Sequence, residues 1–374
     1  MQPYVQLLAA TPTPMSVDEG RSPGVYDGVV AFEVLHLPFA RRRKLVWNPM
    51  MSGPLYEAYD RQLHWIASLH VPGSEMRDPP AFELRFIGGR EPGVVEVFLL
   101  VRASGPGGDE ARARALGLAE VVAALAPVDD VLRPLATAEA FERTGLSEGW
   151  ATGECEDVIE VRRVERWLAP EAAGAQGPLF YAVQAWEWHL LGMEGVWCAL
   201  GRLGRPIALC VSLAPMVWDV GDYAAYESLR AMQQVCQFTA TEARDAAAAL
   251  DLYTCLLYRT ARPFTMRVTL VGAGVPEALA NAVGAALTLP SLQLASPPTV
   301  TPAYVAVRPA DATELAIARY NFEHVRQLTW GEDLAALPLR RWRYAVDARQ
   351  AHTAFRLPVL PEDGYPGVTI ATEV

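Results

Sequence analysis

The stretch "TMRVTLVGAGVPEALANAVGAAL", residues 265 to 287, reads as a strand, a glycine turn and a helix. A dinucleotide-binding fold begins in this way, with two glycines at the turn, a third that lets helix and strand pack, and an acidic residue about twenty positions later. Here Glu277 stands at the third glycine position, and no acidic residue follows at the expected distance. Because a carboxylate at a helix N-terminus would repel a phosphate, we interpret Gly272 to Gly274 as a turn and predict no cofactor.

Two βαβ patterns flank a long helical stretch in the second half of the chain. The strand, helix and strand of the first pattern fall at 179–191, 193–204 and 205–218. Those of the second fall at 264–271, 276–287 and 303–308. We expect residues 219–262 to form two helices that meet at Thr239, because Thr239 and Glu242 have the spacing of a capping box. Two such halves predict an α+β fold with ferredoxin-like split βαβ sheets and a long helical insertion.

A smaller α+β domain is expected before these halves. It has β-rich runs at 82–89 and 93–104 and an amphipathic helix at 109–127, so the block 82–126 is interpreted as a shorter ββα relative of the same unit. The small, flexible residues 171–178 suit a linker. We therefore predict an irregular N-terminal segment 1–80, a small α+β domain 81–172, a split βαβ domain 173–330 with its insertion at 219–262, and an extended C-terminal connector 331–374.

Composition limits the class of protein. The 374 residues are 51% hydrophobic and 20% charged, which is enough apolar material for one large or two medium cores. The formal charge of −11 argues against a general nucleic-acid binder, because that affinity grows with the number of phosphates neutralised. The N-terminus lacks a signal peptide, and the longest apolar run, 206–218, is too short for a membrane span. We therefore expect a cytoplasmic protein, with docking on a membrane complex left open.

Several catalytic motifs can be tested from spacing alone. Lys44 is the single lysine, and it follows three arginines without a glycine loop, which excludes a conventional phosphate-loop ATPase. The six histidines show no metal-ligand spacing and the five cysteines form no CxxC pair, so we expect no metal site and reduced thiols. Cys198 and Cys210 lie in apolar runs that favour inert core residues, while a Cys/His site assembled in space stays open.

A basic cluster is the first candidate for partner binding. It consists of Arg41, Arg42, Arg43 and Lys44. Such a cluster could contact an acidic protein, a lipid or DNA. A solvated turn or sheet edge is the alternative interpretation.

The element order over residues 179 to 360 resembles the N-terminal non-ATPase region of the HerA/FtsK-type ATPases of conjugation and type IV secretion. The resemblance is carried by "VWCALGRLGRPIALCVSLAP" (196–215), "FTMRVTLVGAGVPEALANAVGAAL" (264–287) and "AHTAFRLPVLPEDGYPGVTI" (351–370). In that family a short connector of the last kind leads into the motor domain. The chain reaches Val374 without a phosphate-binding loop, so we expect any motor activity to come from elsewhere.

The resemblance makes the connector the second candidate for partner binding. Phe355, Arg356, Leu357 and Pro358 would lead into the motor. An exposed Phe-x-Leu-Pro segment can add to a partner's sheet edge or fill its groove. A C-terminal arm packed on the protein's own core is the alternative.

Two function hypotheses remain. The resemblance implies a non-catalytic, oligomeric assembly or adaptor module that acts with a hexameric DNA-translocation or secretion ATPase and meets nucleic acid only indirectly. A structural component of a phage or secretion apparatus differs from it mainly in partner. The alternative is a small-molecule-binding protein or enzyme whose pocket is lined by aromatic residues such as Trp186, Trp188 and Trp197, although core packing also explains these.

Overall fold

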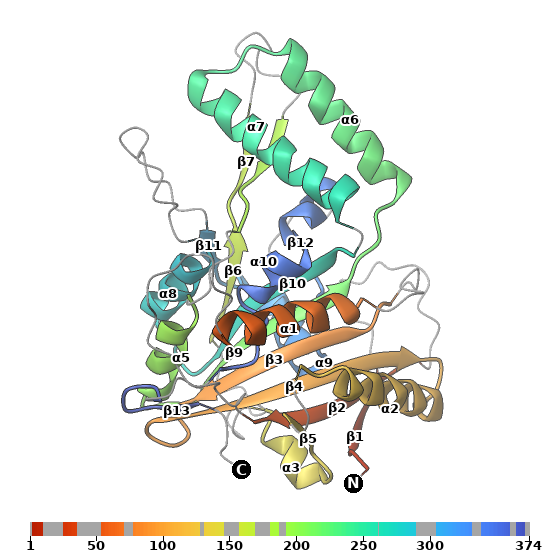
Figure 1. Cartoon of the computed structure of the whole chain (residues 1–374), viewed down its shortest axis with the longest axis vertical. Helices are drawn as coiled ribbons and strands as arrows, with labels where there is room; N and C mark the ends of the chain where they lie inside the picture. The colour runs from red at the N-terminus through yellow and green to blue at the C-terminus, as the bar shows by residue number, and fades with distance from the viewer. Residues whose placement is uncertain are drawn as a thin grey trace.

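A large, mostly antiparallel sheet forms the body of the protein (Figure 1). The computed structural model describes residues 2–9, 25–35, 54–70, 78–127, 131–145, 157–168, 180–186, 192–260, 262–288, 304–330, 338–359 and 364–370. The main strands pair in the order β1-β2-β4-β3-β9-β10-β6-β11. The short strands β5, β12 and β13 add to β2, β10 and β4, and β13 is the one that pairs in parallel.

The sheet consists of two units of the same topology, each with the order β-α-β-β-α-β. The first unit contains β2 (Tyr26–Val34), α1 (Pro54–Ser68), β3 (Ala81–Gly88), β4 (Val94–Gly105), α2 (Gly108–Ala124) and β5 (Leu132–Pro134). The second contains β6 (Asp157–Arg163), α5 (Glu194–Gly201), β9 (Ile207–Pro215), β10 (Phe264–Gly272), α8 (Glu277–Leu287) and β11 (Tyr304–Val307). In each unit the fourth strand pairs with the first and the third lies between first and second, which is the split βαβ arrangement. The predicted α+β class is therefore confirmed.

The two units join edge to edge. β3 pairs antiparallel with β9, from Phe82 opposite Leu213 to Gly88 opposite Ile207. The predicted boundary between residues 172 and 173 separates β6 from its partners β10 and β11. The stretch predicted as irregular, 1–80, supplies α1, β2 and the edge strand β1 (Val5–Ala9) to this body.

The first strand of the second unit differs from the prediction. It is β6, whereas the predicted strand 179–191 corresponds to β8 (Phe180–Val183), which pairs with β7 (Glu165–Leu168) in a separate two-stranded sheet. Residues 187–191 lie outside the described part. Both stretches are rich in β-forming residues, and local composition does not determine which strands a segment will pair with.

One face of the sheet carries the main core. Side chains alternate along each strand, so Phe82, Leu84 and Phe86 of β3 point to the same side. The helices α1, α2, α5 and α8 cover this side together with the short α10 (Ala348–His352). The resulting cluster is continuous across the seam between the units.

Close contact between β2 and α2 depends on a glycine. A Cβ atom at Gly28 would lie 2.5 Å from the carbonyl oxygen of Ala111, which is backbone and cannot move aside. We expect Gly28→Ala to lower the free energy of unfolding by about 1–3 kcal/mol. Gly117→Ala is the matched control within α2, because nothing lies within 4 Å of that position, and it should stabilise by up to about 1 kcal/mol. Urea unfolding of both variants tests this, and equal effects would contradict the packing.

The opposite face of the sheet is partly polar. The helix α9 (Ala312–His324) and residues 325–330 pack on it through Ile317, Phe322 and Trp330. The short helix α3 (Ala138–Glu142) lies near the same face, with Phe141 against the cluster. Charged side chains of the strands fill the space between these apolar contacts.

A helical lobe extends from one end of the sheet. Figure 1 shows α6 (Val220–Val235) and α7 (Ala240–Thr254) at the end of the molecule opposite β1 and β5. These two helices surround a separate hydrophobic core, which also receives side chains from the π-helix η2 (Cys255–Arg259), the 3₁₀ helix η4 (Pro338–Tyr344) and the strands β7 and β8. This core reaches Ala345 of β12 (Ala345–Val346). The predicted capping box is confirmed, because the Thr239 side chain accepts from the Glu242 amide and the Glu242 carboxylate from the Thr239 amide. Among the helices described, none has the length and apolar composition that crossing a membrane requires.

Candidate functional site

The two predicted partner-binding stretches have different outcomes. Arg41, Arg42, Arg43 and Lys44 lie outside the described residues. Phe355, Arg356 and Leu357 have no exposed surface, and Pro358 is buried as well. The expectation of an exposed docking segment at 355–358 is therefore corrected, and the alternative of an arm packed on the protein's own core describes the structure.

Gln62 of α1 holds this connector by its main chain. Its Nε2 donates to the Leu357 carbonyl oxygen at 3.2 Å, and its Oε1 accepts from the Leu357 amide at 2.8 Å. The side-chain amide thus replaces the two hydrogen bonds that a neighbouring strand would supply. Both partners are buried, so release of the segment would break two buried hydrogen bonds and expose the apolar side chains around them.

Arg356 fixes the connector to α5. Its Nη2 donates to Glu194 Oε2 at 3.0 Å, and its guanidinium lies 5.4 Å from the ring centroids of both Tyr59 and Trp197. His352, on the preceding turn, stacks edge-on against Tyr59. Burial, with a further contribution from the Arg356 charge, lowers the pKa of His352 to about 3, so this imidazole is neutral in the folded protein. We name residues 351–359, with these contacts, the connector clamp.

The connector continues into the sheet. After Val359, residues 364–370 return to the sheet, where β13 (Thr369–Ile370) pairs in parallel with β4. The Tyr365 hydroxyl donates to the Val359 carbonyl oxygen at 3.1 Å. The described parts on both sides of residues 360–363 are therefore integrated with the sheet.

A row of ion pairs lies between the sheet and α9. In β3, Arg85 donates to Glu83 at 2.5 Å, and its guanidinium stacks 3.9 Å from the Phe322 ring centroid. In β6, Arg162 donates to Glu160 at 2.8 Å and to the Trp330 carbonyl oxygen at 3.0 Å. Each pair has Glu-x-Arg spacing, which places both side chains on one face of a strand. This spacing is the signal that sequence reasoning overlooked.

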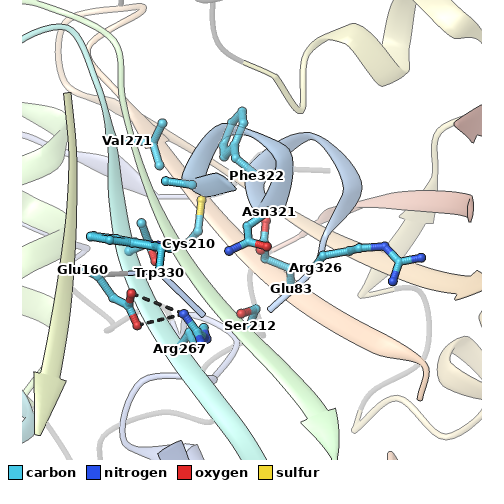
Figure 2. Close-up of a pocket in the computed structure, with 12 residues that line it drawn as sticks. Glu83, Glu160, Cys210, Ser212, Arg267, Val271, Asn321, Phe322, Arg326 and Trp330 are labelled. Atoms are coloured by element: carbon cyan, nitrogen blue, oxygen red, sulfur yellow. Dashed lines mark hydrogen bonds and ion pairs between the residues drawn. The ribbon is translucent and has the colours of Figure 1, made fainter. Parts of the chain in front are cut away.

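Arg267 of β10 joins the Glu160–Arg162 pair of β6. It lies 3.4 Å from Glu160 and donates to the Thr329 hydroxyl at 2.9 Å (Figure 2). Burial alone would raise the pKa of Glu160, but the charges of Arg267 and Arg162 more than offset it and hold that pKa below its ordinary value. Burial raises the pKa of Glu83, and Arg85 offsets this only in part. The carboxylates are thus engaged in holding α9 and its C-terminal extension to the sheet.

The space enclosed by this cluster is small. The cavity lined by Glu83, Ser212, Arg267 and Asn321 measures about 20 Å³, which has room for about one water molecule. Trp186 and Trp197, predicted as lining for a ligand pocket, are buried in the main core, and Trp188 is outside the described residues. Among the residues that the structure describes, neither place has room for a ligand larger than about one water molecule.

A second buried cluster fixes the C-terminal end of α9. Asp27 of β2 accepts from Arg326 Nη2 at 2.6 Å and from Arg326 Nε at 2.9 Å, while Arg102 and Ser104 approach the same carboxylate at 3.3 and 2.7 Å. His324 Nδ1 lies 3.1 Å from Asp27 Oδ2, the oxygen that also accepts from Arg326 Nε. Burial would raise the pKa of Asp27, but the His324 hydrogen bond and the two arginines outweigh it, so this pKa is held far below its ordinary value.

The glycine turn at Gly272 to Gly274 connects the end of β10 to α8. Gly274 has a φ of 61°, which favours glycine, and a Cβ there would lie 3.1 Å from the Arg205 guanidinium. α8 begins at Glu277, one residue after the predicted start, and Pro276 is its N-cap residue. Of the cysteines described, Cys198, Cys210, Cys236 and Cys255 are free thiols, and no group of three His, Cys, Asp or Glu side chains in the described part is arranged to hold a metal.

Comparison with known proteins gives no family assignment. No protein-family model matches the chain, and no curated protein matches it significantly.

Proposed function

We propose that the protein is a non-catalytic assembly or adaptor module that acts with a hexameric DNA-translocation or secretion ATPase. The observation that carries the proposal is the connector clamp. The stretch that resembles the lead into a motor domain is built into the core by Gln62, Glu194 and the aromatic rings around Arg356.

A clamp of this kind suits a scaffold. Segments held by buried contacts open only at a free-energy cost that approaches global unfolding, whereas flexible linkers move freely. A partner held next to the connector would therefore keep a fixed orientation relative to the twin-unit sheet. An adaptor that positions a motor needs this property.

The polar chemistry of the second face supports a structural role. Glu83 pairs with Arg85, and Glu160 pairs with Arg162 and Arg267. Arg267 also donates to Thr329, in the segment that follows α9. These buried ion pairs hold α9 and the residues after it on the sheet. The cavity that the same side chains line has room for about one water molecule.

Two measurements test the proposal. We expect the purified chain alone to hydrolyse ATP at no more than the buffer rate, and to form a stable complex with a phosphate-loop ATPase encoded by an adjacent gene. Size-exclusion chromatography with static light scattering detects that complex. Replacing Arg41, Arg42 and Arg43 together by serine then tests whether the basic cluster contributes to it. Steady ATP turnover by the chain alone would contradict the proposal.

A further inference from the structure

The outward face of α6 is apolar at both ends and uncovered. Val220 is 85% exposed and Val235 is 81% exposed, the two highest values among the large hydrophobic side chains that the structure describes. Ala224, Ser228 and Ala231 lie between them and are exposed as well. At 3.6 residues per turn, these positions fall on one side of the helix, together with Glu227. We name this set of six residues the α6 face.

The inward side of α6 is fixed, so the α6 face cannot turn toward the protein. Tyr226 and Leu229 are buried in the core of the helical lobe. At the N-terminus of the helix, the buried Asp222 accepts from the Asp219 amide at 2.8 Å and from the Trp342 indole at 2.8 Å. Figure 1 shows α6 on the outside of the lobe, remote from the sheet.

The order of residues on the α6 face is palindromic. Val220 and Ala224 precede the midpoint between Glu227 and Ser228 by the same spacings with which Val235 and Ala231 follow it. If two such helices pack antiparallel about a two-fold axis through that midpoint, each Val220 meets Val235 of the other chain. Each Ala224 likewise meets Ala231, and small residues at these positions let two helices approach closely.

We infer that the α6 face binds the α6 face of a second copy of this chain in an antiparallel, two-fold symmetric contact. An isologous contact requires a surface that is complementary to itself, and a palindromic helix face meets that condition. Glu227 of each copy lies beside Glu227 of the other near the two-fold axis, and Arg230, whose Nη1 is 3.7 Å from the Glu227 carboxylate of its own chain, offsets this repulsion. This inference does not depend on the proposed function, because it concerns two copies of the chain and no motor.

The size of the contact predicts its strength. α6 has 16 residues and is about 24 Å long. One helix pair buries less than the roughly 1,200 Å² found at the lower limit of stable complexes. We therefore expect a weak dimer, with a Kd on the order of 10 µM, that a larger assembly would reinforce.

Sedimentation velocity of the full chain over a range of about 1 to 200 µM tests the inference. Two double variants with the same number of new charges provide the comparison. In the first, Val220→Glu is combined with Val235→Lys, so that opposite charges meet across the antiparallel contact. In the second, Val220→Glu is combined with Val235→Glu, so that like charges meet. The two positions are about 22 Å apart along one helix, so they do not interact within one chain.

We expect the wild type to dimerise, the like-charge variant to dimerise at least about 100-fold more weakly, and the opposite-charge variant to regain about tenfold of that loss. Circular dichroism confirms that both variants keep the helical content of the wild type. A wild type that stays monomeric over the whole range overturns the inference. So does a like-charge variant that dimerises as tightly as wild type, since the contact would then lie elsewhere. An opposite-charge variant no tighter than the like-charge one excludes the antiparallel arrangement.

Discussion

Replacing Asp27 by asparagine lowers the free energy of unfolding by about 3–5 kcal/mol, because two buried guanidinium groups lose their fully buried carboxylate and keep only the more exposed Asp78 as an ion-pair partner. Arg326 and Arg102 are each almost wholly buried, and both donate to Asp27. The amide of asparagine keeps the shape but supplies no negative charge. Urea unfolding followed by tryptophan fluorescence measures the difference.

The matched control for this variant is Asp251→Asn, on the exposed side of α7. This change should alter the free energy of unfolding by less than about 0.5 kcal/mol. If both variants were equally mild, the buried cluster would not hold α9 as described.

The stability that Asp27 supplies also depends on pH. Its pKa in the folded protein lies below the ordinary value of 3.8, so below neutral pH the unfolded chain takes up the proton first. The contribution is therefore complete at neutral pH and declines as the pH falls below about 4. The difference in unfolding free energy between wild type and Asp27→Asn should shrink when the measurement moves from pH 6 to pH 3. A difference that grows toward acid would contradict the assigned direction.

Replacing Gln62 by leucine lowers the free energy of unfolding by about 2–5 kcal/mol, because the amide and carbonyl of Leu357 both lose their buried partner. Leucine fills nearly the same volume, so the loss reports the two hydrogen bonds rather than a cavity. Thermal and urea unfolding measure the effect, and limited proteolysis should show new cleavage near residue 357.

Gln237→Leu is the control, since Gln237 is exposed after the end of α6. It should leave the stability within about 0.5 kcal/mol of wild type and produce no new cleavage. If Gln62→Leu behaved in the same way, the connector clamp would not be part of the stable core.

Local patterns in the sequence predicted the elements that carry strong periodicity or caps. The strand at 264–271, the helix at 276–287 and the capping box at Thr239 all have counterparts in the structure. The block at 82–126 was interpreted as a relative of the second unit, and β3, β4 and α2 do belong to a unit of the same topology. In these cases the signal lies within a few residues.

Pairing between distant segments could not be predicted in the same way. The role of β6 as a first strand depends on β10 and β11, more than a hundred residues later. Burial of Arg356 depends on Glu194 and Tyr59, and the main chain of Leu357 depends on Gln62, 295 positions earlier. A polar segment with prolines reads as an exposed arm until its partners are known. The Glu-x-Arg pairs in β3 and β6 were visible signals of a polar sheet face that the sequence reasoning did not use.

Amide hydrogen exchange over residues 351–359 tests the central claim most directly, because the proposed function depends on a connector that is part of the folded core. Mass spectrometry of the native full chain can compare peptides from this segment with peptides from β9 and β10. We predict that the connector exchanges as slowly as those central strands, with the Leu357 amide among the most protected positions. Complete exchange of the connector within seconds, while β9 and β10 remain protected, would contradict the account.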